Sequence, residues 1–154
     1  MNYSKSLLLY EDKPEYGLFL RLIFTVVPAA MLIGSIVLFS QRDNEGSLAL
    51  LAEAFIVGAI FWVVLPRKYQ VYEDQIRIVL GGPFSIKVRF EQIKAIEITS
   101  RPTLSANFVT KFAKNCVLIS KKRGLSIAIT PRDNDSFIEN ANEAISQWAK
   151  ARIN

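Results

Sequence analysis

The sequence has no histidine and a single cysteine among its 154 residues. Without histidine, neither a Ser-His nor a Cys-His nucleophile pair can form, and no zinc ion can have a histidine ligand. One cysteine cannot form a disulfide within the chain, so the cysteine content says nothing about the redox compartment. The common nucleotide-binding, metalloprotease and hydrolase motifs are also missing. These absences predict a protein that is not an enzyme and has no catalytic residues, no cofactor and no metal site.

Charged residues make up only 21% of the chain, and they are unevenly distributed. Residues 1–66 contain 4 Lys/Arg and 6 Asp/Glu, a net charge of −2, whereas residues 67–154 contain 15 and 8, a net charge of +7. The apolar residues concentrate in the acidic first part. We therefore expect an N-terminal segment with a membrane hairpin at 1–67 and a cytoplasmic domain at 68–154.

Two apolar stretches have the length of membrane-spanning helices. Leu22–Ser40 contains no charged residue, and Leu48–Pro66 contains only one, Glu53. At about 1.5 Å per residue, each helix would be roughly 28 Å long, close to the ~30 Å hydrocarbon core of a bilayer. The short connection between them forces an antiparallel hairpin. Lysine and arginine flank the hairpin on its outer sides, which predicts a multi-pass protein of the cytoplasmic membrane with both termini in the cytoplasm.

Glu53 is the one ionisable residue inside the expected spans. We expect it about one turn from the outer membrane surface, where its carboxylate can extend toward the headgroups or toward Arg42. The alternative is a polar intramembrane group of a small transport or channel component that forms a homo-oligomer through the hairpin. Small residues spaced four apart, which allow close helix packing, occur in both stretches: Ala30 and Gly34, Ala54 and Gly58.

The second half of the chain changes to the two-residue period of β-strands. Apolar and polar residues alternate from Phe84 to Phe90 and again from Leu125 to Ile129, as they do in strands with one buried face. Residues 137–148 return to a helical period, and Thr130-Pro131 is typical of an N-cap and first helical residue. Six or seven short antiparallel strands followed by one amphipathic helix are therefore expected.

This order of elements resembles the bacterial pleckstrin-homology-like (PH-like) domains of the YyaB type over about residues 68–148. The matching features are the turn that leads into Ile-Arg-Ile, the Gly-Gly-Pro hairpin and the closing Ile-Thr-Pro-Arg-Asp segment. The resemblance implies an α+β protein: an N-terminal two-helix transmembrane hairpin, then a PH-like, partly open seven-strand β-barrel capped by a C-terminal amphipathic helix. It implies no enzymatic activity. The acidic first turn, Glu73-Asp74-Gln75, departs from the basic turn of phosphoinositide-binding PH domains and argues against such headgroups as ligands.

Basic residues around the later strands form the candidate headgroup or partner surface: Lys111, Lys114, Lys121, Lys122 and Arg123. Near a membrane, each basic residue adds about 1 kcal/mol of attraction to anionic headgroups. The same residues could serve only to keep the domain soluble. Nucleic-acid binding is disfavoured, because no aromatic residues are interleaved with the basic ones. The predicted function is a membrane-anchored module whose partners are the lipid bilayer and a protein or anionic lipid at the cytoplasmic face.

Overall fold

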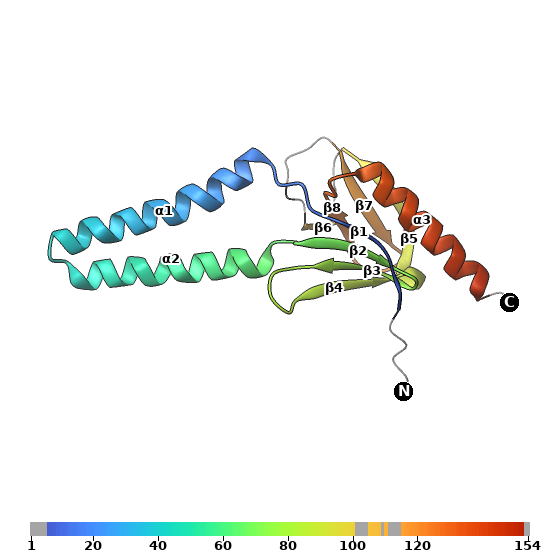
Figure 1. The fold of residues 1–154 in the computed structure, drawn as a ribbon, viewed down its shortest axis with the longest axis horizontal. Coiled ribbons are helices and arrows are strands. Elements are labelled where there is room, and N and C mark those ends of the chain that lie inside the picture. The colour runs from blue at the N-terminus through green and yellow to red at the C-terminus, as the bar shows by residue number, and fades with distance from the viewer. Residues whose placement is uncertain (1–5, 101–104, 109, 111–114, 153–154) are drawn as a thin grey trace, which may run out of the picture.

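The computed structural model describes the chain in four parts: residues 6–100, 105–108, 110 and 115–152. Two long helices, α1 (Leu18–Ser40) and α2 (Asn44–Val64), form a hairpin. The hairpin projects from a domain made of β-strands and a third helix, α3 (Asn134–Ala151) (Figure 1). The chain is therefore an α+β protein, and from α1 onward it has the expected order of helical hairpin, β-strands and C-terminal helix.

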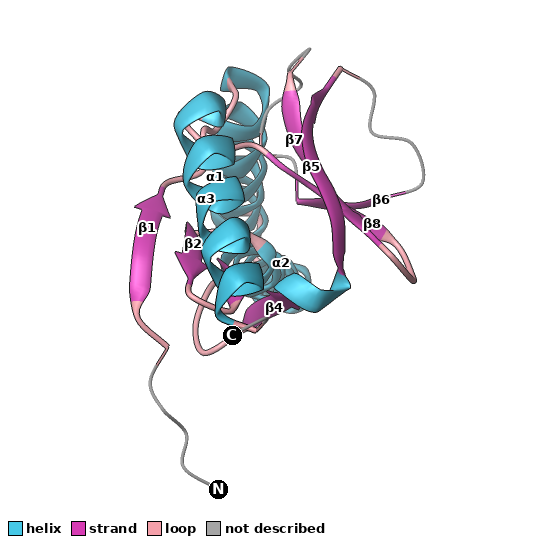
Figure 2. Ribbon diagram, turned by 90° about the vertical axis from the view of Figure 1, so that its right-hand side faces the viewer, coloured by secondary structure: helices cyan, strands magenta, loops and turns pink. Residues whose placement is uncertain are grey.

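Within the described residues, eight strands form two four-stranded sheets, with the orders β1-β2-β3-β4 and β5-β7-β8-β6 (Figure 2). The strands are β1 (Leu8–Asp12), β2 (Lys68–Tyr72), β3 (Gln75–Val79), β4 (Ser85–Arg89), β5 (Ile93–Thr99), β6 (Ser105–Phe108), β7 (Cys116–Lys121) and β8 (Ser126–Ile129). A 3-10 helix, η1 (Phe90–Gln92), joins the two sheets. The barrel is not closed. The prediction of antiparallel strands was wrong for β6, which pairs parallel to β8.

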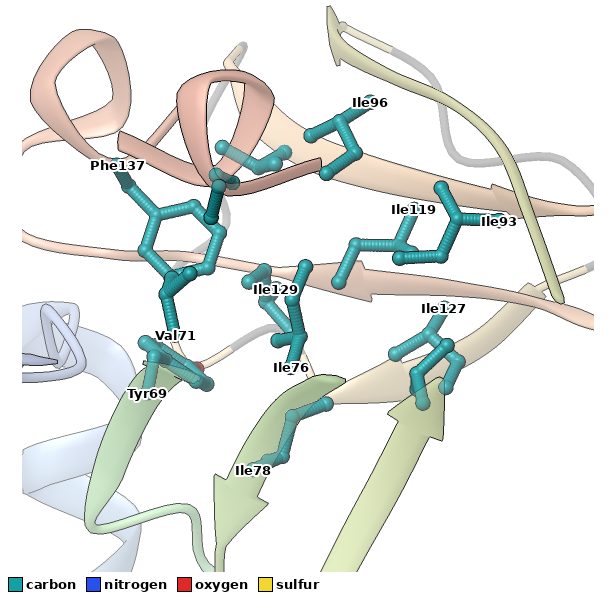
Figure 3. Packing of buried hydrophobic residues seen from close by; sticks show 14 of the residues in the cluster. Tyr69, Val71, Ile76, Ile78, Ile93, Ile96, Ile119, Ile127, Ile129 and Phe137 are labelled. Carbon is teal, nitrogen blue, oxygen red and sulfur yellow. The ribbon is translucent and has the colours of Figure 1, made fainter. Parts of the chain in front are cut away.

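The two sheets and α3 enclose one apolar core. Side chains at alternate positions of β2 and β3 are buried, as the two-residue period predicts. They meet side chains from β5, β7 and β8 (Figure 3). Helix α3 lies between the two sheets (Figure 2), and its Phe137 packs edge-on against Tyr10 and Tyr69, with ring centroids 6.3 Å away in both cases. The helix therefore covers one side of the apolar core.

The strand β1 lies before the helical hairpin in the sequence, and no strand was predicted there. It pairs with β2, the strand that follows the hairpin, from Leu8 opposite Tyr72 to Asp12 opposite Tyr69. Its bond pattern contains a register shift after Leu8. Because the segments on either side of the hairpin belong to one sheet, both ends of the hairpin lie on the same side of any membrane that it crosses.

The hairpin turns more tightly than the apolar stretches suggest, since they leave residues 41–47 between them and only 41–43 separate α1 from α2. Helix α2 begins at Asn44 because the Asp43 side chain accepts a hydrogen bond from the amide of Gly46 (2.9 Å) and caps the helix. Arg42 has a φ of 63°, which lets the chain reverse within the turn. Inside the hairpin, Ser35 and Ser47 each donate a hydroxyl hydrogen bond to the other's carbonyl, both at 2.9 Å.

Almost all of the hairpin surface is apolar and exposed. Both helices are long and apolar enough to cross a membrane, yet only 6% and 11% of their most apolar windows are buried within the protein. A core helix of a soluble domain would be mostly covered by other parts of the chain. These properties suggest that the hairpin associates with a membrane.

The start of α3 differs from the expected capping pattern. The cap is Asp133, whose side chain accepts from the amide of Ser136 (3.0 Å), rather than Thr130. Thr130 is buried, and its carbonyl accepts from the amide of Glu15 (3.0 Å). Pro131 forms an isolated bridge with Pro14. The segment before α3 therefore contacts the segment that precedes α1.

The first end of the hairpin is held by Thr110 together with Thr130. The amide of Gly17, the residue before α1, donates to the carbonyl of Thr110 (2.9 Å). The Thr110 hydroxyl donates to the carbonyl of Glu15 (2.7 Å) and lies 2.8 Å from the Thr130 hydroxyl. Both threonines are 2% exposed, so their hydroxyl groups are removed from solvent and satisfied within this network.

The second end of the hairpin is held by the turn between β3 and β4. The amide of Gly81 donates to the carbonyl of Val63 in the last turn of α2 (3.2 Å). A Cβ atom on Gly81 would lie 1.5 Å from the carbonyl oxygen of Trp62, so only glycine permits this approach. The hydroxyl of Tyr16 donates to the carbonyl of Pro66 and links the two ends. The hairpin is thus attached to the β domain at both of its ends.

Candidate functional site

Three of the candidate basic residues occupy the turn between β7 and β8, which we name the distal basic turn: Lys121, Lys122 and Arg123. Lys121 ends β7 and pairs with Ile93 at the start of β5. Gly124 has a φ of 82°, a left-handed conformation that glycine adopts without steric cost, and it lets the chain enter β8. Lys122 and Arg123 are exposed, so the charged ends of both side chains are available to a partner.

The distal basic turn lies at the end of the domain away from the hairpin. Strand β2 begins just after α2 and ends in a turn at Asp74, whose carbonyl accepts from the amide of Phe90 in η1 (3.0 Å). At the end of η1, the carbonyl of Gln92 accepts from the amide of Lys122 (2.8 Å). A five-residue strand such as β2 is about 16 Å long, and this length separates the distal basic turn from α2. Figure 1 shows β5, which starts beside the turn, on the side of the domain opposite the hairpin.

A depression of about 330 Å³ adjoins the distal basic turn, and its other lining residues are Glu91 and Gln92. The Glu91 carboxylate lies 3.6 Å from the guanidinium group of Arg89 and 3.8 Å from that of Arg152. These two arginines more than balance Glu91, which is the one acidic residue that lines the depression, so the three residues of the turn add to a positive excess at the surface. Such an excess attracts an anionic group and raises its rate of encounter.

The structure thus brings together three of the five predicted basic residues. Lys111 and Lys114 lie outside the described residues. The sequence reasoning missed Glu91, Gln92 and Arg152. A signal existed for Arg152, because it follows Trp148 by four residues on one helix face, and its guanidinium carbon lies 4.8 Å from the Trp148 ring centroid.

Glu53 lies on α2 with its side chain exposed on the outside of the hairpin. Because α2 already begins at Asn44, Glu53 is nine residues into the helix, about 13 Å from its start. Helix α2 therefore starts before its apolar stretch, and the predicted position of Glu53 about one turn from the outer membrane surface stays a prediction. Its carboxylate is more than two helical turns from Arg42 along α2.

Cys116 is the single thiol of the chain and is 1% exposed. Its sulfur donates a hydrogen bond to the carbonyl of Thr99 (3.3 Å), and burial raises the pKa of the thiol. A raised pKa disfavours the thiolate, which is the reactive form. Cys116 is thus a buried thiol at the start of β7. Among the described residues, no group of three or more His, Cys, Asp or Glu side chains could hold a metal ion.

Comparison with known proteins identifies the β domain. Residues 67–144, just over half of the chain, match the family model described as bacterial PH domain. The match covers β2 to β8, which are seven strands, together with the first part of α3. It confirms the resemblance that the sequence suggests. Neither a curated protein nor a solved structure matches the chain.

Proposed function

Because the chain belongs to the bacterial PH domain family, we propose that it is a membrane-anchored interaction module, without catalytic activity, that binds a protein or lipid at the cytoplasmic face. PH-like domains are generally non-catalytic interaction modules. The two apolar helices provide the anchor, and the distal basic turn provides the binding surface. In this proposal, residues 1–67 form the anchor with the segment that precedes it, and residues 68–154 form the PH-like domain. The strand β1 belongs to the first part but pairs with β2 of the domain.

The observation that carries this proposal is the double attachment of the hairpin. One end is hydrogen-bonded to Thr110, and the other end is hydrogen-bonded to Gly81. A hairpin in the bilayer would therefore hold the PH-like domain close to the membrane in a defined orientation. This arrangement suits a module that presents a binding surface to partners in the cytoplasm.

The position of the distal basic turn favours an anionic partner beyond the membrane that the hairpin crosses. The turn is a strand's length away from α2, and the attraction between exposed charges falls off over a Debye length of about 8 Å at physiological salt. An acidic protein segment can approach the turn without crossing the headgroup layer. Lys122 and Arg123 are exposed and can form charge-assisted hydrogen bonds with carboxylate or phosphate groups.

Site-specific photocrosslinking in cells tests this surface. A photoreactive residue in place of Lys122 should give a discrete crosslinked product, whereas the same residue in place of Lys87 should not. Lys87 is also an exposed lysine, on β4 in the other sheet, and serves as the matched control. Replacing Arg123 with Glu should reduce the product, because it inserts a like charge beside an anionic partner. No product at Lys122, or equal products at both positions, would overturn the proposal.

The cytoplasmic position of both termini rests on the positive-inside bias and on the pairing of β1 with β2. Reporter fusions at each terminus should both report the cytoplasm. A terminus found outside would reverse the orientation, and opposite locations would contradict the pairing of β1 with β2.

The alternative function, a small oligomeric transport or channel component, depends on Glu53. An exposed carboxylate about 13 Å along a membrane helix is costly unless it is protonated or meets a polar partner, and a second copy of the hairpin could supply that partner. Glu53→Gln should leave the oligomeric state in native membranes unchanged if the chain is an interaction module. Loss of a higher oligomer in this variant, with Glu45→Gln at the helix start as the control, would favour the alternative.

A further inference from the structure

The turn between β3 and β4 carries apolar side chains that the β domain leaves uncovered. Phe84 is 52% exposed, although it directly precedes β4. Trp62, in the last turn of α2, is 53% exposed. Gly82 lies between them: a Cβ atom at Gly82 would be 3.0 Å from the Trp62 ring and 3.9 Å from the Phe84 ring. The helix end and the β-turn therefore share one continuous apolar surface.

The contact between the turn and α2 fixes the position of this apolar surface along the helix, and so its depth relative to a membrane that the helix crosses. Gly81 approaches the backbone of Trp62 so closely that no other residue fits there, and its amide bonds to Val63. The apolar run that ends at Pro66 is about 28 Å long, so Trp62 lies near the inner boundary of a ~30 Å hydrocarbon core. Figure 1 shows the β3–β4 turn beside the end of α2, on the side of the domain that faces the hairpin.

The residues around this surface have the chemistry of a membrane interface. Arg67 lies with its guanidinium carbon 5.9 Å from the centroid of the Trp62 ring. Aromatic residues and arginine are enriched at the headgroup level, where an apolar ring and a polar or charged group are both accommodated. At the opposite end of the hairpin's base, Leu18 in the first turn of α1 is 75% exposed.

From this geometry we infer that the β3–β4 turn is a further membrane contact: Phe84, beside Trp62, enters the boundary between lipid headgroups and acyl chains. The inference rests on the proposed membrane anchoring and deepens it. The occupant of the surface is the bilayer that surrounds α2, because the apolar surface of the turn continues the lipid-facing surface of that helix. The contact is a third support besides the two helices, and it prevents the β domain from tilting about the hairpin.

A single-tryptophan reporter tests the contact in the full chain, reconstituted in vesicles of phosphatidylcholine and phosphatidylglycerol. Phe84→Trp is introduced in a Trp62→Phe and Trp148→Phe background. The control is Leu125→Trp in the same background, because Leu125 is 60% exposed but adjoins the distal basic turn. Lipids with a nitroxide near the headgroup end of the acyl chain should quench the fluorescence of the reporter at position 84 and leave the control unquenched. The emission maximum at position 84 should also lie at shorter wavelength than that of the control.

Equal emission and equal quenching at positions 84 and 125 would overturn the inference. A third variant, which keeps Trp62 as the sole tryptophan, separates the two proposals. Quenching of Trp62 without quenching at position 84 contradicts the turn contact alone, and no quenching of Trp62 contradicts the membrane anchor itself. If the tryptophan replacements impair folding, Phe84→Cys in a Cys116→Ser background carries a spin label. Its accessibility to oxygen should then exceed its accessibility to a water-soluble nickel complex, and the reverse order would count against the contact.

Discussion

In the hairpin of α1 and α2 the buried side chains are small or polar, whereas in the β domain most of them are large and apolar. The buried residues of the two helices are Ser35, Ser47 and Ala54. The buried residues of the domain include Tyr69, Phe137 and several isoleucines. This difference is the one expected for a hairpin in lipid. Water favours burial of apolar area, but lipid does not, so membrane helices associate through close packing and hydrogen bonds.

The two regions also differ in what a single substitution should cost. Removal of a large side chain from the β domain loses both the hydrophobic gain and the packing around it. Removal of one hydroxyl group from the hairpin loses one hydrogen bond, whose net contribution in a membrane averages about 0.6 kcal/mol. The comparison predicts that substitutions in the core of the β domain reduce stability most, and that substitutions in the hairpin or at the surface reduce it much less.

Phe137→Ala should have the largest effect. Phe137 is 0% exposed and joins α3 to β1 and β2 through its contacts with Tyr10 and Tyr69. Its truncation should lower the free energy of unfolding of the β domain by about 3–5 kcal/mol. Denaturant titration in detergent, followed by the fluorescence of Trp148, measures this loss. The control Leu125→Ala should change the free energy by less than about 0.5 kcal/mol, and similar losses in both variants would contradict the assigned core.

Gly81→Ala should have the next largest effect, because it places a Cβ atom 1.5 Å from the carbonyl oxygen of Trp62. Relief of this overlap requires the β3–β4 turn to move away from α2, at a cost of about 1–3 kcal/mol. The thermal midpoint in detergent should fall. Gly58→Ala is the matched control, since a Cβ atom at Gly58 meets nothing within 4 Å. A fall of equal size in the control would show that the contact between the turn and the helix has no special role.

The two regions were also not equally predictable from the sequence. The hairpin and the alternating strands follow from hydrophobic length and period, which are local properties, and the family resemblance is confirmed over 67–144. The strand β1 was missed because Leu8–Asp12 pairs with residues that lie beyond the hairpin. Pairing across so long an insertion leaves no local signal. The parallel pairing of β6 was missed for the same reason.

The candidate site was predictable only in part. Basic residues around the later strands could be found by charge, and Lys121 to Arg123 come together because they are consecutive. The sequence could not show that η1 supplies Gln92 and Glu91 to the same surface, since Gln92 contributes its backbone carbonyl. The apolar pattern also could not show that the Asp43 cap starts α2 ahead of its apolar stretch.

Ser47→Ala tests the interior of the hairpin. The variant removes the hydroxyl group that donates to the carbonyl of Ser35 at 2.9 Å, and it should weaken the association of α1 with α2 by about 0.5–1 kcal/mol. Titration with a denaturing detergent, followed by circular dichroism, measures the change. The control is Ser40→Ala, because the Ser40 hydroxyl bonds to the carbonyl of Val37 within the same helix. An equal change in both variants would exclude a role for the interhelical bond.

Glu11→Gln should have the smallest effect, and the effect should depend on pH. Hydrogen bonds from Lys68, at 2.7 Å, and from Gln70 lower the pKa of the Glu11 carboxyl group. A pKa that is lower in the folded state gives stability that is present above the unfolded-state pKa and is lost as the pH falls through the folded-state pKa. Because the pair is exposed, it contributes at most about 1 kcal/mol at neutral pH, and less in high salt.

The stability difference between the natural chain and Glu11→Gln should therefore be present at neutral pH and vanish in acid. Hydrogen exchange of the β1 amides measures it locally, since Glu11 pairs with Gln70 in the adjacent strand. Glu97→Gln, at an exposed position of β5 in the other sheet, should leave the exchange of β1 unchanged at every pH. A difference for Glu11→Gln that persists unchanged in acid would mean that the effect does not come from the ionised carboxylate. No difference at any pH would mean that β1 is held by its backbone bonds and packing alone.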